Sequence, residues 1–314
     1  MQLTNKYRPK KMCEVVGQDE IVMALENKSE LNDHILFSGP SGSGKTTVAY
    51  ILAKKFNLPI FELNASDDRG IDIIRNKVKP LCRSKGKRII FLDESDQLSF
   101  DAMSALRRMM EKTESIFILT GNNTWKIIPA IQSRCAFYEF KPLTSKVILS
   151  RLLEICVAEN ITIDKDAQMG LLELLEQAGG DMRKAINLLS KTINKDNTIT
   201  LATVKSFIKP KIARESFKLA IDGRFVEAHK MMEDAYHQSQ LNPTYIIKEL
   251  FESIKEVKDI GIKTKLFREL ATTESRCKIQ ADPVSPLIQL VGFLSFVYLV
   301  PHLSIECPVL KGGI

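Results

Sequence analysis

The sequence has few features of metal-binding or secreted proteins. Its 6 cysteines are scattered, none of them pairs as C-x-x-C, and no histidine cluster lies near them. A zinc site is therefore not expected, and scattered thiols suit a reducing intracellular compartment. The first residues, Met1 to Lys6, also lack the apolar core that a signal peptide would have.

Long apolar runs, internal repeats and low-complexity segments are missing as well. The most apolar late run, residues 287–300, is interrupted by Gln289 and Gly292 and is too short to span a bilayer. We therefore expect a buried helix there, and no membrane among the partners of the protein.

The composition is that of an ordinary globular protein. The chain has 314 residues, of which 44% are hydrophobic and 26% charged, and this length suffices for two or three domains with their own cores. The net charge of +7 favours a polyanionic partner only modestly, because an excess of this size can also be a solvated surface.

One stretch fits the phosphate-binding pattern G-x-x-x-x-G-K-[ST], and it consists of Gly39, Pro40, Ser41, Gly42, Ser43, Gly44, Lys45 and Thr46. Glycines let the backbone turn its N–H groups toward phosphate oxygens. Lys45 would contact the β- and γ-phosphates, and the Thr46 hydroxyl would bind Mg²⁺. An apolar run at 35–37 predicts a strand before the loop, and residues 47–56 predict a helix after it. This context disfavours the alternative, a glycine-rich surface turn.

Strands and helices alternate through the first half of the chain, which predicts a parallel α/β sheet with ligands at the strand C-terminal ends. We expect further strands at 60–63, 88–92, 116–120 and 136–140, helices at 71–79 and 100–112, and a short turn at 127–132. After residue 142 the pattern predicts helices only, at 143–159, 166–177, 181–193, 201–207, 225–236, 243–259, 263–277 and 286–300. Residues 301–314 predict no clear element.

A second acidic motif follows the third strand, where an apolar run ends in Asp93 and Glu94. Downstream of a phosphate-binding loop this is typical of a Walker B motif. Asp93 would hold Mg²⁺, directly or through water, and Glu94 would orient and polarise the attacking water. An acidic turn after a strand is the alternative, and Ser95 and Asp96 are expected to shape the loop.

The next strand ends in Asn122 and Asn123. Either amide could hydrogen-bond the γ-phosphate or the water, but asparagine also simply ends strands and begins turns. Spacing alone leaves the two uses equally open.

Several strings together resemble the small subunit of replication factor C, the clamp loader of archaea and eukaryotes within the AAA+ ATPases. They include residues 6–9, 16–18, 62–67, 69–72, 91–94, 106–109, 132–135 and 180–187, together with the phosphate-binding loop. The resemblance is dense from about residue 5 to 195 and only architectural after 210.

The resemblance implies roles for single residues. Ser133-Arg134-Cys135 resembles the arginine-finger motif, so Arg134 would reach the ATP site of a neighbouring subunit. Arg183, in the string Gly180 to Arg183, would act as sensor 2 on a lid helix. Asn122 aligns with the sensor 1 asparagine. An ordinary surface arginine and a structural salt bridge are the respective alternatives for Arg134 and Arg183.

The same resemblance assigns residues around the nucleotide: Tyr7, Arg8, Pro9 and Val16 near the adenine, and Thr47 after the phosphate-binding loop. The sequence departs from the family at several positions. Ser41 and Ser43 stand where Pro and Thr are usual, Ser95 replaces an Ala, and Gly121 replaces a frequent Cys. None of these changes removes a reacting group, so ATPase competence is still expected.

Basic residues on two expected helices are candidates for DNA contact, namely Arg75, Lys79 and Arg83 on one and Arg107 and Arg108 on the other. Pro80 is expected to break or kink the first helix. In clamp loaders such helices follow duplex phosphates, although similar stripes are usually solvated faces. Leu98, Phe100 and Met103 are candidates for touching a sliding clamp, or for core packing.

We therefore predict an α/β fold with three domains: an AAA+ P-loop parallel-sheet domain (1–141), a small helical lid (142–208) and an all-α collar for oligomerisation (209–314). The resemblance implies ATP and Mg²⁺ as cofactors and ATP-dependent loading of a PCNA-type sliding clamp onto primer–template DNA. It implies as partners the clamp, a large subunit, further copies of the chain, and DNA. The compartment would be the cytoplasm (nucleoid) of a prokaryote or the nucleus of a eukaryote.

Two other functions compete with this one. A different AAA+ DNA motor, such as a branch-migration helicase, is disfavoured by the Ser-Arg-Cys string and the long helical C-terminus. A non-hydrolysing scaffold subunit is disfavoured because Lys45, Thr46, Asp93, Glu94 and Arg134 are all present.

Overall fold

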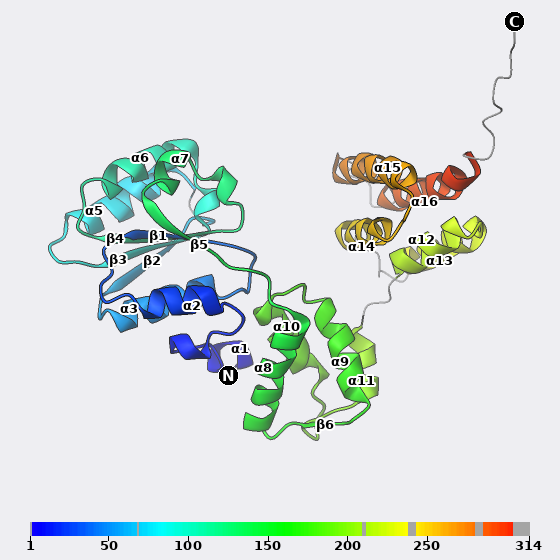
Figure 1. Ribbon diagram of the computed structural model, residues 1–314, viewed down its shortest axis with the longest axis horizontal. Coiled ribbons are helices and arrows are strands. Elements are labelled where there is room, and N and C mark those ends of the chain that lie inside the picture. The colour runs from blue at the N-terminus through cyan, green and yellow to red at the C-terminus, as the bar shows by residue number, and fades with distance from the viewer. Residues whose placement is uncertain (1, 68, 209–211, 238–242, 280–284, 304–314) are drawn as a thin grey trace, which may run out of the picture. The chain divides into compact units, whose positions relative to one another are not determined.

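The computed structural model describes residues 2–67, 69–208, 212–237, 243–279 and 285–303 (Figure 1). The chain forms two compact units, residues 1–208 and 209–314. Separate hydrophobic clusters fill the sheet region and the helices that follow residue 142 within the first unit. The further division of that unit into a nucleotide-binding domain and a lid stays a prediction.

A five-stranded parallel sheet forms the centre of the first unit, as predicted. It consists of β1 (His34–Ser38), β2 (Ile60–Asn64), β3 (Ile89–Asp93), β4 (Ile116–Gly121) and β5 (Cys135–Glu139), in the order β2-β3-β4-β1-β5. Because all strands run the same way, their C-terminal ends share one edge, where the loops carrying the predicted site residues begin.

Helices cover both faces of this sheet (Figure 1). α2 (Asp19–Glu26) and α3 (Lys45–Lys55) lie on one face, and α6 (Phe100–Met110) and α7 (Pro129–Gln132) lie on the other. Successive side chains of a strand point to opposite faces, so Ile35 and Phe37 pack with the first layer and Leu36 with the second. β1, β3 and β4 are buried on both sides and therefore appear in the sequence as nearly continuous apolar runs, which is why they were predictable.

The segment around Pro80 stays helical, so of the two expected outcomes, a break or a kink, the break is wrong. α4 (Ile71–Ile73), η2 (Ile74–Val78) and α5 (Lys79–Arg83) follow one another without a loop, and η2 is a π-helical turn. Proline lacks an N–H and crowds the carbonyl of the preceding turn, and the wider π-helical turn, a rare element, lies at that position. The winding therefore changes just before Pro80, and the helical segment continues to Arg83.

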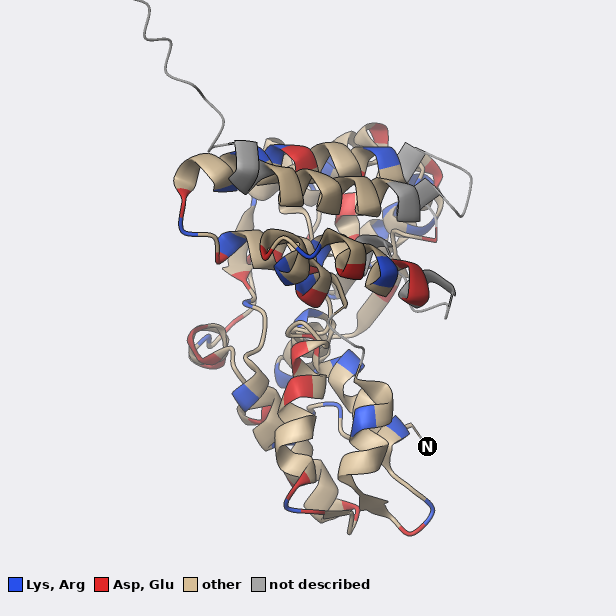
Figure 2. Cartoon of the chain, turned by 90° about the vertical axis from the view of Figure 1, so that its right-hand side faces the viewer, with Lys and Arg blue, Asp and Glu red and all other residues tan. Residues whose placement is uncertain are grey.

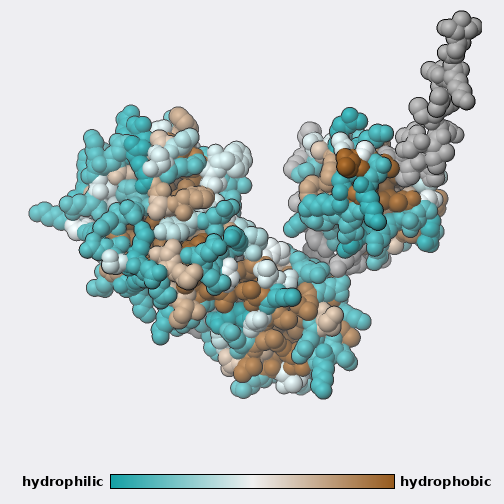
Figure 3. Space-filling view, viewed as in Figure 1, coloured by the Kyte–Doolittle hydropathy of each residue, from teal (hydrophilic) through white to brown (hydrophobic). Residues whose placement is uncertain are grey.

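Helices α8 (Ser145–Ala158), α9 (Ala167–Glu176), α10 (Met182–Thr192) and α11 (Leu201–Phe207) follow the sheet. We call this region, residues 142–208, the lid. The expectation of helices only is corrected by two short strands, β6 (Thr162–Ile163) and β7 (Thr198–Ile199), which pair in parallel. The N-terminal α1 (Leu3–Lys6) packs on α10. Figure 3 shows hydrophobic residues gathered on the lid face around α8 and α10.

In its described residues, the second unit has helices as its only regular elements, and these have their own core. It contains α12 (Ile212–Ile221), α13 (Phe225–His237), α14 (Pro243–Lys255), α15 (Ile260–Ile279) and α16 (Ser285–Leu303). Leu290, Phe293, Leu294 and Val297 are buried, which confirms the buried helix predicted late in the chain. None of the helices in the described part of the chain is both long and apolar enough to cross a membrane. Figure 2 shows charges of both signs interspersed on this unit's helices.

Candidate nucleotide-binding site

The phosphate-binding loop lies between β1 and α3, at the edge of the sheet where the strands end. Gly44 is the N-cap of α3 and has φ = +109°, a backbone conformation that side chains disfavour. The loop therefore turns directly into the N-terminus of α3. N–H groups at such a terminus, together with its dipole, form a general anion-binding arrangement.

Lys45 is the best-anchored side chain of this loop. Its Nζ donates to the carbonyl oxygens of Gly39 at 2.7 Å and Pro40 at 2.8 Å, and to Asn122 Oδ1 at 3.0 Å. Burial lowers the pKa of the Lys45 ammonium, while the charge of Asp93 opposes this shift. The three acceptors hold the ammonium inside the pocket. Of the two candidate asparagines, Asn122 is the one that is hydrogen-bonded to Lys45.

Asp93 lies at the C-terminal end of β3, and its carboxylate links the acidic motif to the phosphate-binding loop through the Thr46 hydroxyl. Thr46 Oγ1 donates to Asp93 Oδ2 at 3.1 Å, and Thr120 Oγ1 donates to the other oxygen, Oδ1. Magnesium prefers such oxygen ligands and usually takes one or two from the protein. The donor set of Thr46 and Asp93 therefore fits the predicted magnesium site.

Glu94 follows in an unusual backbone conformation. Its φ of +54° and ψ of +40° lie in the left-handed region. This conformation raises the free energy of a non-glycine residue by about 1–3 kcal/mol. The Glu94 N–H donates to Thr120 Oγ1 at 3.0 Å, and the side chain remains exposed. Ser95 and Asp96 are buried; Ser95 donates to the Leu92 carbonyl at 2.8 Å and Asp96 accepts from the Asn123 N–H at 3.1 Å. The strained turn thus directs Glu94 outward while its neighbours shape the loop.

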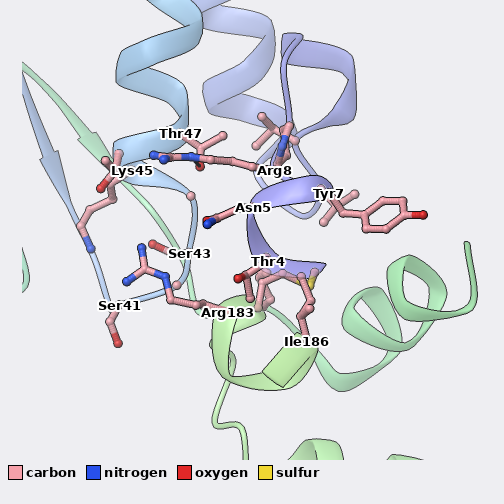
Figure 4. A pocket seen from close by; sticks show the side chains of 18 of the residues that line it. Thr4, Asn5, Tyr7, Arg8, Ser41, Ser43, Lys45, Thr47, Arg183 and Ile186 are labelled. Carbon is pink, nitrogen blue, oxygen red and sulfur yellow. Dashed lines mark hydrogen bonds between the residues drawn. The ribbon is translucent and has the colours of Figure 1, made fainter. Parts of the chain in front are cut away.

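A cavity of about 360 Å³ joins these residues to the N-terminal segment and the lid (Figure 4). Of the predicted residues, those that line it are Tyr7, Arg8, Pro9, Val16, Ser41, Gly42, Ser43, Gly44, Lys45, Thr46, Thr47, Asp93, Glu94, Asn122 and Arg183. Gly39 and Pro40 lie behind them and accept hydrogen bonds from Lys45. The predicted nucleotide residues thus come together, and their individual roles stay predictions.

Two residues of the N-terminal segment are tied to different parts of the unit. The Tyr7 hydroxyl donates to Glu159 Oε1 at 2.6 Å at the end of α8, and Figure 4 shows its ring pointing away from the P-loop. Arg8 Nε donates to Thr47 Oγ1 at 3.2 Å and its guanidinium lies 5.2 Å from the centre of the Tyr50 ring. The segment therefore bridges the lid and α3 across the cavity.

The cavity also contains residues that the sequence did not suggest. They are Gln2, Thr4, Asn5, Glu14, Val15, Thr120, Gly121, Leu143, Arg151, Met182, Ile186 and Asn187. Ile186 and Asn187 could have been found, because they lie three and four residues after Arg183 and share its helix face. Arg151, on α8, had no such signal.

Arg134 lies outside this lining. It follows α7, where its guanidinium donates to the Ala130 carbonyl at 2.6 Å and pairs with Glu111 at 2.5 Å. Its side chain is 35% exposed. Arg134 is therefore held by its own subunit without touching its own nucleotide pocket, and its action on a neighbouring subunit stays a prediction.

The five basic residues proposed for DNA contact come from segments on the same side of the sheet, since α4 and η2 both contact α6. Arg75, Lys79, Arg83 and Arg108 are exposed and Arg107 is partly exposed. Their contact with DNA stays a prediction.

Of the three apolar candidates for clamp contact, Leu98 and Met103 are 6% and 3% exposed and pack in the core. For these two residues the alternative that was left open, core packing, is confirmed. The start of a helix does not show from sequence alone which apolar residues face inward. Phe100 is 71% exposed and remains a candidate.

Known proteins resemble this chain over most of its length. Residues 35–143 match the AAA family, the ATPase family associated with various cellular activities. The replication factor C small subunit of Methanococcus maripaludis is 40% identical over 278 residues, covering 83% of this chain and 87% of the relative. That of Archaeoglobus fulgidus is 36% identical over 311 residues, covering 93% and 95%.

The solved structure of the RuvB Holliday junction branch migration motor of Thermotoga maritima has a TM-score of 0.55 and 18% identity to this chain. The similarity covers 68% of this chain and 79% of the RuvB chain. At this identity the likeness shows the fold alone, and it does not favour a branch-migration function.

Proposed function

This chain belongs to the replication factor C small subunits, clamp-loader ATPases of the AAA+ class, and we propose that it uses ATP to open a PCNA-type sliding clamp and load it onto primer–template DNA. One observation carries the proposal. A single cavity contains the groups that ATP hydrolysis requires: Lys45, Thr46, Asp93, Glu94, Asn122 and Arg183.

The phosphates of ATP would lie against the loop before α3. The Lys45 ammonium would neutralise charge on the β- and γ-phosphates, and Asn122, already bonded to it, would contact the γ-phosphate. Thr46 and Asp93 would hold Mg²⁺, which when bound supplies charge neutralisation between the phosphates. Arg183 would approach the γ-phosphate from the lid.

Glu94 would act on the attacking water. Its exposed carboxylate stands at the strand end beside Asp93, and a carboxylate there can accept a proton from water as it attacks. Arg134 of a neighbouring subunit would complete the site, because an arginine is always charged and its planar donors suit a phosphoryl group. Hydrolysis would then depend on assembly with other copies and with a large subunit.

DNA would trigger hydrolysis by contacting the basic residues near α5 and α6 through duplex phosphates. The clamp would be released after hydrolysis. A role in replication implies that the protein acts inside the cell, where the chromosome is.

The ATPase rate of Glu94→Gln, with primed DNA, distinguishes this motor from a non-hydrolysing scaffold. We expect a loss of at least about a hundredfold in rate, with ATP binding retained, because the amide cannot accept the proton of the water. Glu114→Gln, which changes an exposed glutamate in the loop before β4, is the matched control. A Glu94→Gln protein that hydrolyses ATP as fast as this control would show that the assignment is wrong.

A further inference from the structure

The lid is bonded to the phosphate-binding loop at the start of α10. Asp181 is the N-cap of α10, where its Oδ1 accepts a hydrogen bond from the Lys184 N–H at 2.9 Å. Its other oxygen, Oδ2, accepts a hydrogen bond from the Ser41 hydroxyl at 3.0 Å. Beside it, the Met182 N–H donates to the Gly42 carbonyl at 3.2 Å. The first turn of α10 is therefore bonded to two successive residues of the loop.

Gly42 shows how closely the two parts approach. A Cβ at Gly42 would lie 1.8 Å from Asp181 Oδ1, and the φ of Gly42 is +67°. Any side chain there would both strain the backbone and push the lid off the loop. Gly42 therefore serves the contact with the lid in addition to the turn of the loop.

This contact determines where Arg183 lies. Arg183 follows Asp181 by two residues, in the first turn of α10, and lines the cavity. Figure 4 shows its side chain extending from α10 toward the P-loop side of the pocket. Because the first turn of the helix is fixed to Ser41 and Gly42, the position of the Arg183 backbone relative to the loop is fixed as well.

The side chain at position 41 supplies one of the two bonds. The Ser41 hydroxyl donates to Asp181, and a residue without a side-chain donor there would leave the bond from the Met182 N–H to the Gly42 carbonyl.

We infer that Asp181 is a positioning residue for ATP binding, which through Ser41 holds α10 and Arg183 at the phosphate-binding loop. The inference rests on the proposed function, since it concerns the same pocket. Ordering side chains and loops at the moment of binding weakens affinity. A lid that is already held in place avoids part of that cost.

Substitutions at Ser41 test the contact without removing the cap of α10. Ser41→Ala deletes the hydroxyl but leaves Asp181 to accept from Lys184, and Ser41→Thr keeps a hydroxyl. Equilibrium binding of ATP with Mg²⁺ to the full-length chain is measured for each. We expect Ser41→Ala to weaken ATP binding about fivefold, the factor that one net hydrogen bond represents, and Ser41→Thr to restore binding.

A double-mutant cycle with Arg183→Ala tests whether the contact acts through Arg183. In that background we expect Ser41→Ala to have no further effect on ATP binding, because the group it positions is gone. Thr200→Ala is the matched control, since Thr200 caps α11 through the Thr203 N–H at 3.3 Å. We expect it to lower the melting temperature and to leave ATP binding unchanged.

The inference is overturned if the Ser41→Ala protein binds ATP with wild-type affinity. It is also overturned if the losses of ATP affinity caused by Ser41→Ala and Arg183→Ala are additive. Failure of the wild-type chain to bind ATP would instead contradict the proposed function. The two failures are therefore distinguishable in the same experiment.

Discussion

Gln18 is expected to stabilise the junction between the sheet and the lid through its side-chain hydrogen bonds. It is 4% exposed, and its amide pairs with the backbone of Lys141, where the chain leaves β5 for the lid. Gln18 Nε2 donates to the Lys141 carbonyl at 2.8 Å, and the Lys141 N–H donates to Gln18 Oε1 at 3.2 Å. Gln18 Nε2 also lies 3.5 Å from the Ser43 carbonyl oxygen, at the outer limit of a hydrogen bond. Replacing Gln18 by alanine removes the two shorter bonds, those to Lys141, at once.

The expected cost follows from these two bonds. Each contributes about 1 kcal/mol net, so Gln18→Ala should lower the free energy of unfolding by about 2 kcal/mol. For a unit of this size, about 2 kcal/mol corresponds to a fall of about 4–8 °C in melting temperature. Gln18→Glu should lower the melting temperature at least as much as Gln18→Ala. Its carboxylate would place an acceptor against the Lys141 carbonyl, which is itself an acceptor.

Thermal unfolding followed by circular dichroism measures this effect. Gln168→Ala is the matched control, since Gln168 is an exposed residue of α9. If Gln18→Ala melts at the same temperature as Gln168→Ala, then the pairing with Lys141 does not stabilise the junction and the reasoning is refuted.

Two further predictions concern titration. Burial lowers the pKa of His34, whose Nδ1 accepts from the Phe117 N–H at 3.1 Å while Nε2 lies 3.1 Å from the Met110 carbonyl. The unfolded chain then binds the proton more readily, so the free energy of unfolding should fall as pH drops below about 6.5, by less than about 1.4 kcal/mol per pH unit. Denaturant unfolding of His34→Gln across this range should lack that slope; an unchanged slope would contradict it. Burial also raises the pKa of the Cys135 thiol to about 12, so at pH 8 it should react with iodoacetamide far more slowly than the exposed Cys13, as peptide mass mapping would show. Equal rates would contradict the described burial.

The sheet and the phosphate-binding loop were predictable because local chemistry determines them. Strands such as β1 and β3 are buried on both faces and so read as apolar runs. The loop needs glycine and lysine at fixed spacing, and the acidic pair must follow a strand end. Such requirements are visible in a single sequence.

The remaining features depend on contacts between distant segments. The bond between Ser41 and Asp181 joins residues 140 positions apart, and the bond between Tyr7 and Glu159 joins residues 152 apart. β6 and β7 are two residues long, too short for any alternation to appear. Pro80 predicts a break or a kink from local rules alone, and the helical segment continues through it after a π-helical turn.

The ATPase rate of the assembled complex tests the central claim most directly. The chain, wild type or Arg134→Ala, is assembled with the large subunit and assayed with and without primed DNA and a sliding clamp. We predict stimulation by DNA and clamp in the wild type, and its loss in Arg134→Ala with ATP still bound, because Arg134 would complete the site of its neighbour. Arg134→Lys should recover little, since lysine lacks the planar donors. A wild type without stimulation, or full activity without Arg134, would contradict the account.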